Sequence, residues 1–351
     1  MIRECKAERL KMLGQMFPQG IPELWCPLLT SYDSEGHIDR ERMRIHMQRL
    51  SPWVRHFLVP GSTGDGWEMT PEEIYEVLDI VVEIAGQTDS RILIGVLKTG
   101  RSEARQGILD ILEWLKRRTG SEDTAACLEE AKVCGFTVCP PKGKELTQAE
   151  IRSELEAVLG LGVPTALYQL PQITENEISP EVLAGLSGRY SNFFLFKDTS
   201  GADRAALSGY DFNGVFFVRG AEGGYDRWIR SNGGKYDGFL LSTANCFAKE
   251  LSTVMRLLRS GEAEAARQLS GRLSGAVTEV FGEVSGLPAG NAFTNANKAM
   301  DHILAYGKSA AERRGPRLHS GDLLPEDILR KAAGILDRYG LMSEKGYLET
   351  Y

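Results

Sequence analysis

Short apolar segments alternate with segments of helical periodicity from about Glu23 to Leu241. The apolar segments are rich in β-branched and aromatic residues and too short for helices, so we interpret them as strands. There are eight of them, and they read ELWCPLL, HFLVPG, RILIGVL, GFTVCPP, VPTALYQ, FFLFKD, GVFFVRG and YDGFLLS. Strands that alternate with helices predict a parallel sheet, and eight such units predict a (β/α)8 TIM barrel.

Capping residues mark the ends of several predicted helices. In TPEEIYEVLDIVVEIAG, Thr70 and Glu73 predict a capping box, and we expect Gly86 to end the helix. The segment TQAEIRSELEAVLG repeats this arrangement with Thr147 and Glu150. These signals support helices between the second and third and between the fourth and fifth strands.

The chain divides into three parts. Residues 1–19 are expected to form a helical extension, and residues 20–246 the barrel, with an insertion near residues 117–134 because the third crossover is long enough for two helices. Residues 247–351 are expected to form a C-terminal helical region. Its helices are predicted near Ala248 to Arg259, Glu262 to Phe281, Phe293 to Tyr306 and Pro325 to Tyr339.

Composition narrows the class of protein. Of 351 residues, 42% are hydrophobic and 25% charged, which is typical of a globular chain. The net charge is −7 without a long cationic block, so nucleic acid is not expected as a partner. The six cysteines form no CxxC pair and no cluster with the five histidines, so we expect no metal, cofactor or disulfide framework. Neither a secretory signal nor a membrane-spanning segment is evident, so a soluble, cytoplasmic protein is expected.

The stretch FFLFKDTSG places Lys197 directly after four large apolar residues. Such a strand is apolar on both faces, and an unpaired amine is costly to bury there. One interpretation is that Lys197 reaches water or pairs with Asp198. The other is catalysis, because TIM barrels carry their chemistry at the C-terminal ends of the strands.

Tyr168 ends the preceding strand, so it is the natural partner for this lysine. Neighbouring strands lie roughly 5 Å apart, so the phenol and the amine of Lys197 can meet over the barrel mouth. A desolvated amine has a lowered pKa and can attack a carbonyl to form a Schiff base, and the phenol can move protons. The alternative is a rim tyrosine with a satisfied hydroxyl.

The loop PGSTGDGWEMT after the second strand adds a candidate anion site. Gly61 and Gly64 allow backbone N–H groups to turn inward, and Ser62 and Thr63 supply hydroxyls. A carboxylate fits such a nest, although the same sequence is also typical of a turn before a capped helix. The joint placement of the three features on strand ends two, five and six favours a site.

In their order and spacing, these segments resemble the dihydrodipicolinate synthase and N-acetylneuraminate lyase family of Schiff-base, pyruvate-handling aldolases. The resemblance is collinear from about Gly20 to Leu341. WCPLLTSYDSEGHID is similar to the first strand and loop of the family, and PGSTGDGWEMTPEE to its Gly-Thr-Thr-Gly-Glu loop. YQLPQIT resembles the Tyr-Asn-x-Pro segment, FKDTSG the segment with the Schiff-base lysine, and GAEGG the Gly-Asp segment.

The resemblance implies roles for these residues. Lys197 would form the Schiff base and Tyr168 would be the proton shuttle. The substrate-binding residues that it implies are Ser62 and Thr63 for the carboxylate, with Gly61 in the same loop, and Gly220 and Glu222 for the distal end of the substrate. It also implies a homo-oligomer, either a homotetramer or a homodimer.

Two departures from the family pattern bear on the substrate. Pro141 and Lys142 stand where the synthases carry a tyrosine pair, and Ile173 stands where they carry an arginine for the carboxylate of the second substrate. The resemblance therefore does not extend to true dihydrodipicolinate synthesis. Lys142 is the one nearby residue that offers a substitute charge.

Three functions remain as hypotheses. The first is a class I aldolase, a carbon–carbon lyase that acts on a 2-oxo acid such as pyruvate and on an aldehyde, including sugar-derived aldehydes. The second is a dehydratase or hydratase that uses the same lysine iminium. The third is a barrel that binds a small acid without turnover.

Overall fold

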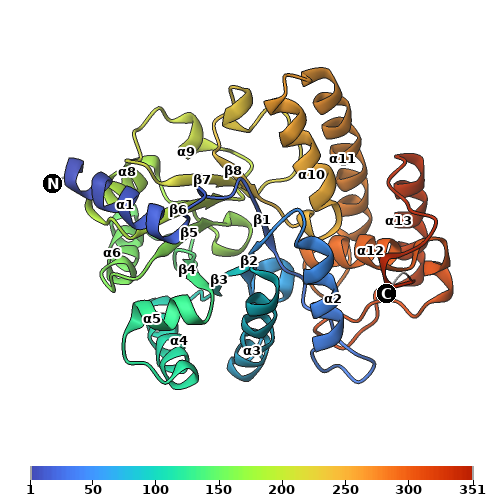
Figure 1. The fold of residues 1–351 in the computed structure, drawn as a ribbon, viewed down its shortest axis with the longest axis horizontal. Helices are drawn as coiled ribbons and strands as arrows, with labels where there is room; N and C mark the ends of the chain where they lie inside the picture. The colour runs from blue at the N-terminus through green and yellow to red at the C-terminus, as the bar shows by residue number, and fades with distance from the viewer. Residues whose placement is uncertain (1, 350–351) are drawn as a thin grey trace.

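Eight parallel strands form a closed barrel in sequence order in the computed structural model, which describes residues 2–349 (Figure 1). The TIM-barrel prediction is therefore confirmed. The strands are β1 (Leu24–Pro27), β2 (His56–Val59), β3 (Arg91–Val96), β4 (Val133–Val138), β5 (Thr165–Gln169), β6 (Phe193–Asp198), β7 (Phe216–Arg219) and β8 (Gly238–Leu240).

Helices surround the barrel and continue beyond it. Those within the barrel region are α2 (Arg40–Leu50), α3 (Pro71–Thr88), α4 (Glu103–Thr119), α5 (Thr124–Glu130), α6 (Gln148–Leu159), α7 (Pro171–Thr174), α8 (Pro180–Arg189) and α9 (Arg204–Leu207). Before it lies α1 (Ile2–Met16), and after it come α10 (Ala244–Arg259), α11 (Ala263–Val284), α12 (Ala292–Tyr306) and α13 (Glu326–Arg338). Four short 3-10 segments complete the described chain: η1 (Ser62–Gly64), η2 (Arg230–Asn232), η3 (Gly307–Glu312) and η4 (Tyr347–Glu349).

Two details differ from the sequence prediction. Gly86 does not end its helix, because α3 continues to Thr88 and ends at Asp89 in a left-handed conformation. The crossovers after β6 and β7 contain only α9 and η2, so these two units lack a long helix. The capping boxes at Thr70 and Thr147 are both present.

The N-terminal helix α1 closes the N-terminal end of the barrel. Its Leu13, together with Phe17 just beyond its end, packs into the same buried cluster as the barrel-interior residues Trp25 and Leu58. Arg9 is buried and donates to backbone carbonyls of α8 and β6, including Phe193 O at 2.7 Å. Figure 1 shows α1 on one side of the barrel and the C-terminal helices α10 to α13 on the other.

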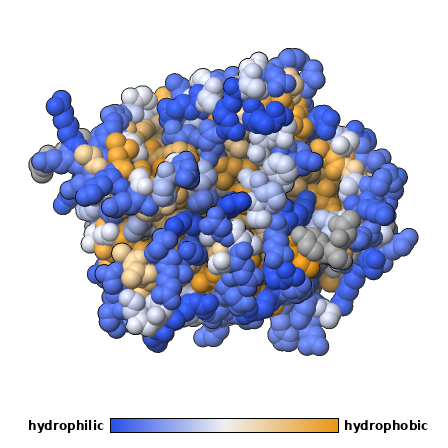
Figure 2. All heavy atoms as spheres, in the orientation of Figure 1, coloured by the Kyte–Doolittle hydropathy of each residue, from blue (hydrophilic) through white to orange (hydrophobic). Residues whose placement is uncertain are grey.

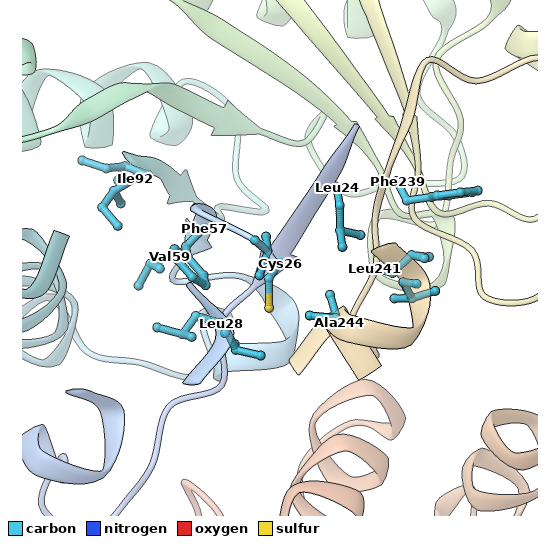
Figure 3. Close-up of a cluster of buried hydrophobic side chains, with 14 of the residues drawn as sticks. Leu24, Cys26, Leu28, Phe57, Val59, Ile92, Phe239, Leu241 and Ala244 are labelled. Atoms are coloured by element: carbon cyan, nitrogen blue, oxygen red, sulfur yellow. The ribbon is translucent and has the colours of Figure 1, made fainter. Parts of the chain in front are cut away.

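Strand residues alternate between the barrel interior and the layer under the helices, as the two-residue period of a strand requires. Leu24 and Cys26 of β1 lie in the outer layer with Phe57 and Val59 of β2 (Figure 3). The intervening Trp25 faces the interior. This alternation decides which side chains at the strand ends reach the mouth of the barrel.

The outer surface is mainly hydrophilic in the view of Figure 2, with apolar residues visible in small areas between polar ones. All six cysteines are free and buried. No helix in residues 2–349 has both the length and the apolar character needed to cross a membrane.

Candidate active site

Lys197 lies inside the barrel because it shares a strand face with Leu195. All six residues of β6 are buried, and Leu195 belongs to the interior cluster. Two positions further along the strand, the side chain of Lys197 points the same way, and it is only 4% exposed. The lysine therefore lies near the end of the strand, within the mouth of the barrel rather than in open solvent.

Tyr168 is the direct neighbour of Lys197 across the sheet. The two residues are paired in the β5–β6 register, and Lys197 Nζ lies 4.0 Å from the centre of the Tyr168 ring. The salt bridge between Lys197 and Asp198 considered from the sequence is not formed. Asp198 points to the outer side, where it accepts hydrogen bonds from Ser200 N at 2.9 Å and Tyr236 Oη at 3.2 Å.

Burial sets the protonation of this pair. Desolvation lowers the pKa of Lys197 to about 7, although Cys139, Glu222 and Cys26 oppose the shift. Burial also raises the pKa of the Tyr168 phenol and of the Cys139 thiol above their ordinary values. At neutral pH the site thus combines a substantial fraction of neutral amine with a phenol that keeps its proton.

The loop after β2 brings Ser62 to the same place. Ser62 Oγ lies 3.3 Å from Tyr168 Oη and accepts a hydrogen bond from Trp67 Nε1 at 2.8 Å. Thr63 follows in the same single turn η1, and both side chains are buried. The N–H group of Gly64 donates to Gly61 O, so that group is already used within the turn.

Gly220 and Glu222 follow β7 on the other side of Lys197. A Cβ atom at Gly220 would clash with Thr199 Oγ1 and would come within 3.0 Å of Lys197 Cε. The Glu222 carboxylate accepts four hydrogen bonds, from Ser242 Oγ at 2.7 Å, Thr243 N at 3.1 Å, Thr243 Oγ1 at 2.6 Å and Tyr225 Oη at 3.0 Å. These hydrogen bonds hold the Glu222 side chain in place near the lysine.

Several residues at this end of the barrel were not singled out from the sequence. Thr199 Oγ1 is buried without a hydrogen-bond partner in the described chain. Thr294 Oγ1 of α12 donates to Ser62 O and Thr63 O. Asn291, the residue directly before α12, donates from Nδ2 to Ser62 O. Thr199 lies within the quoted FKDTSG segment, but Asn291 and Thr294 lie some 230 positions from Ser62 and give no sequence signal.

The structure also shows the surroundings of Lys142 and Ile173, which depart from the family pattern. Lys142 Nζ pairs with Glu175 Oε1 at 3.0 Å, and both side chains are about half exposed. Ile173 lies in α7 and packs against the cluster that contains Tyr168 and Leu170. The lysine thus already has a carboxylate partner, whereas the isoleucine contributes apolar surface beside the site.

The chain is a TIM-barrel enzyme of the aldolase type of lyases, as its similarity to known proteins indicates. The dihydrodipicolinate synthetase family model matches residues 119–292, in agreement with the resemblance of the sequence motifs to that family.

Curated relatives are similar to the chain in sequence, and solved structures are similar to it in fold. The 4-hydroxy-tetrahydrodipicolinate synthase of Methanococcoides burtonii is 24% identical over 271 residues, which cover 74% of this chain and 83% of that protein. YagE from E. coli K12, solved in complex with pyruvate, is 17% identical with a TM-score of 0.69, covering 91% of this chain and 98% of that one. A variant of the Sulfolobus solfataricus 2-keto-3-deoxygluconate aldolase is 17% identical with a TM-score of 0.68, covering 90% and 96%.

Proposed function

We propose that this protein is a Schiff-base-forming aldolase that joins pyruvate, or a close 2-oxo acid, to an aldehyde, or cleaves the product. The observation that carries the proposal is the buried amine of Lys197, which has no ion pair within residues 2–349, lies over the Tyr168 ring and has a pKa of about 7. The names of the relatives support the proposal, since they include an aldolase and a family member solved with pyruvate.

The first half of the reaction builds the imine. The neutral amine of Lys197 adds to the C2 carbonyl carbon of the 2-oxo acid, and the carbinolamine loses its oxygen as water to give an iminium. Tyr168 Oη, close to the amine, donates the proton that the departing hydroxide needs and is left as phenolate. The hydroxyls of Ser62 and Thr63 are the proposed donors to the substrate carboxylate.

The second half uses the iminium as an electron sink. The phenolate of Tyr168 takes a proton from C3, which gives an enamine whose C3 attacks the aldehyde carbon. The aldehyde oxygen then takes the proton back from Tyr168. Water adds to the iminium carbon and gives one proton to the Tyr168 phenolate, and loss of the amine then releases a 4-hydroxy-2-oxo acid and restores both neutral Lys197 and the Tyr168 phenol. Cleavage is the same sequence in reverse.

Reductive trapping tests the imine. Incubation with pyruvate and borohydride should add a lactyl-type mass to the peptide that contains FKDTSG, read by intact mass and peptide mapping. Lys197→Ala should abolish both labelling and turnover, and Lys197→Arg should not rescue them because a guanidinium stays protonated. Labelling at another lysine, or none with any 2-oxo acid, would contradict the proposal.

Replacing Tyr168 by Phe tests the proton shuttle. The variant keeps the ring beneath the amine and removes only the hydroxyl, so the fold should persist while turnover falls by about a hundredfold to ten-thousandfold. Steady-state kinetics with a 4-hydroxy-2-oxo acid measures this, with circular dichroism as the folding control. Turnover equal to the unmodified enzyme would show that Tyr168 is only a rim tyrosine.

The same assays separate the two other hypotheses. An aldolase releases pyruvate from a 4-hydroxy-2-oxo acid, whereas a dehydratase keeps the carbon skeleton intact. A barrel that only binds a small acid would be labelled by borohydride without any turnover.

Condensation with aspartate semialdehyde is not expected, because Ile173 offers no charge to the second carboxylate and Lys142 is paired with Glu175.

A further inference from the structure

Three large apolar side chains remain partly exposed at the same end of the barrel as Lys197. They are Trp67 from the loop after β2, Ile173 from α7 and Phe293 from the first turn of α12. All three pack against one buried cluster, formed by Leu97, Cys139, Tyr168 and Leu170. We refer to Trp67, Ile173 and Phe293 as the apolar mouth.

The apolar mouth is continuous with the reacting groups. Trp67 donates to Ser62 Oγ, which lies 3.3 Å from Tyr168 Oη, and Tyr168 supports Lys197. Phe293 is held from behind by Phe281, whose ring centre is 5.8 Å away in an edge-to-face contact. An aldehyde that approached Tyr168 from the side of this cluster would therefore meet these three side chains.

Several polar side chains around the mouth are already engaged with the protein, and Thr199 Oγ1 is an exception. Asn291 Nδ2 donates to Ser62 O at 3.0 Å, and Gln172 Nε2 lies 3.4 Å from Thr199 O. Glu222 accepts four hydrogen bonds, and Lys142 is paired with Glu175. A polyhydroxylated or carboxylated aldehyde would thus lose water against the apolar mouth with few donors or acceptors to replace it.

We propose that the aldehyde partner carries an apolar body, aromatic or branched aliphatic, which packs against Trp67, Ile173 and Phe293. This inference rests on the proposed aldolase function and names the substrate class for the same site. It departs from the sugar-derived aldehyde considered from the sequence. The aldehyde carbon accepts the C3 electron pair of the enamine, its oxygen takes a proton from Tyr168, and hydrolysis frees a 4-hydroxy-2-oxo acid with the apolar group on C4.

Condensation assays with one 2-oxo acid and three aldehydes test the proposal. Pyruvate is held constant with benzaldehyde, D-glyceraldehyde or succinic semialdehyde, and products are quantified by mass spectrometry. The kcat/KM for benzaldehyde should exceed that for each of the other two by at least tenfold, the order of discrimination that apolar pockets achieve. Equal values, or a preference for either polar aldehyde, would overturn the inference.

Variants separate the pocket from the intrinsic reactivity of each aldehyde. Ile173→Asn and Phe293→Ala should each lower kcat/KM for benzaldehyde by about tenfold and change that for D-glyceraldehyde by much less. Leu10→Asn is the matched control, because Leu10 is an exposed apolar residue on α1, at the opposite end of the barrel. It should leave both values unchanged.

Reductive trapping with pyruvate in the same samples tells the two proposals apart. Labelling of Lys197 in the unmodified enzyme and in both mouth variants shows that folding and imine formation persist. If Lys197 is labelled and an aldehyde condenses, but benzaldehyde is not favoured, only the substrate class is wrong. If Lys197 is labelled and no aldehyde condenses, the aldolase function is contradicted together with the inference. If no labelling occurs, the aldolase function itself is wrong and the inference falls with it.

Discussion

At the scale of single residues, the environment of Lys197 decides its chemistry. A lysine in water has a pKa of about 10.4 and is almost wholly protonated at neutral pH. Here desolvation dominates, and the nearby thiols and Glu222 only partly oppose it. The aromatic ring of Tyr168 accommodates the ammonium form, so the residue can exist in both states within the same packing.

The pH dependence of imine formation should report this pKa. The neutral amine is the nucleophile, so the rate of trapping with pyruvate and cyanoborohydride should rise with pH up to about 7 and then level off. Rates measured from roughly pH 5 to pH 9.5 would locate the midpoint. A rate that kept rising towards the ordinary lysine pKa would show that the amine is solvated.

At the scale of elements, strand register and close backbone approach assemble the site. The β5–β6 register pairs Tyr168 with Lys197, and the period of two turns Asp198 to the outer side of the barrel. Gly220 follows β7 on the far side of Lys197. Its backbone lies so close to Thr199 that no side chain would fit between the two residues. A site of this kind depends on one glycine as much as on the reactive groups.

Replacing Gly220 by Ala should disturb this packing. The new methyl group would force Thr199 and Lys197 to shift, with a loss of stability of about 1–3 kcal/mol and at least a tenfold loss of trapping rate. Gly86→Ala is a matched control, because no atom lies within 4 Å of a Cβ added there. Gly86 lies inside α3, so that control should stabilise by about 0.5–1 kcal/mol. Unchanged trapping in Gly220→Ala would contradict the assigned geometry.

At the scale of the whole molecule, the C-terminal helices form part of the site. Thr294 near the start of α12 holds the Ser62 turn, and Asp301 further along α12 binds α2 of the barrel. Asp301 Oδ2 accepts from Arg42 Nη2 at 2.6 Å, and Asp301 Oδ1 accepts from Tyr347 Oη at 2.9 Å. Although burial alone would raise the pKa of Asp301, Arg42, His46 and Arg49 hold it far below its usual range.

Asp301→Asn should destabilise the enzyme by roughly 3 kcal/mol, because it leaves Arg42 buried beside a neutral group. Because the pKa of Asp301 is lower in the folded than in the unfolded chain, the carboxylate stabilises the fold fully above the unfolded pKa of about 3.9. The difference in free energy of unfolding between the unmodified enzyme and Asp301→Asn should therefore be complete at neutral pH and shrink in stronger acid. Urea unfolding measures it. Asp327→Asn, an exposed change on α13, should stay within about 0.5 kcal/mol. Equal stability of the two variants would refute the structural role of Asp301.

The sequence by itself determined the barrel and the position of the lysine that we propose as the nucleophile. Strand and helix periods, capping boxes and the rule that chemistry lies at strand ends are local or fold-level features, and they were enough to select Lys197, Tyr168 and the Ser62 loop. The predictions made from the sequence were wrong where local signals were weak. Gly86 lies within a helix whose apolar stripe outweighs the cost of one glycine, and the crossovers after β6 and β7 lack long helices.

Only the tertiary structure decided what surrounds the lysine. The unformed pair with Asp198, the four hydrogen bonds on Glu222, the pairing of Lys142 with Glu175 and the apolar mouth all depend on contacts between separate elements. Such contacts arise from barrel closure, strand register and the docking of α12, none of which is encoded within a single segment. The charge and solvation of a buried amine follow from those contacts, so its reactivity is a property of the folded chain.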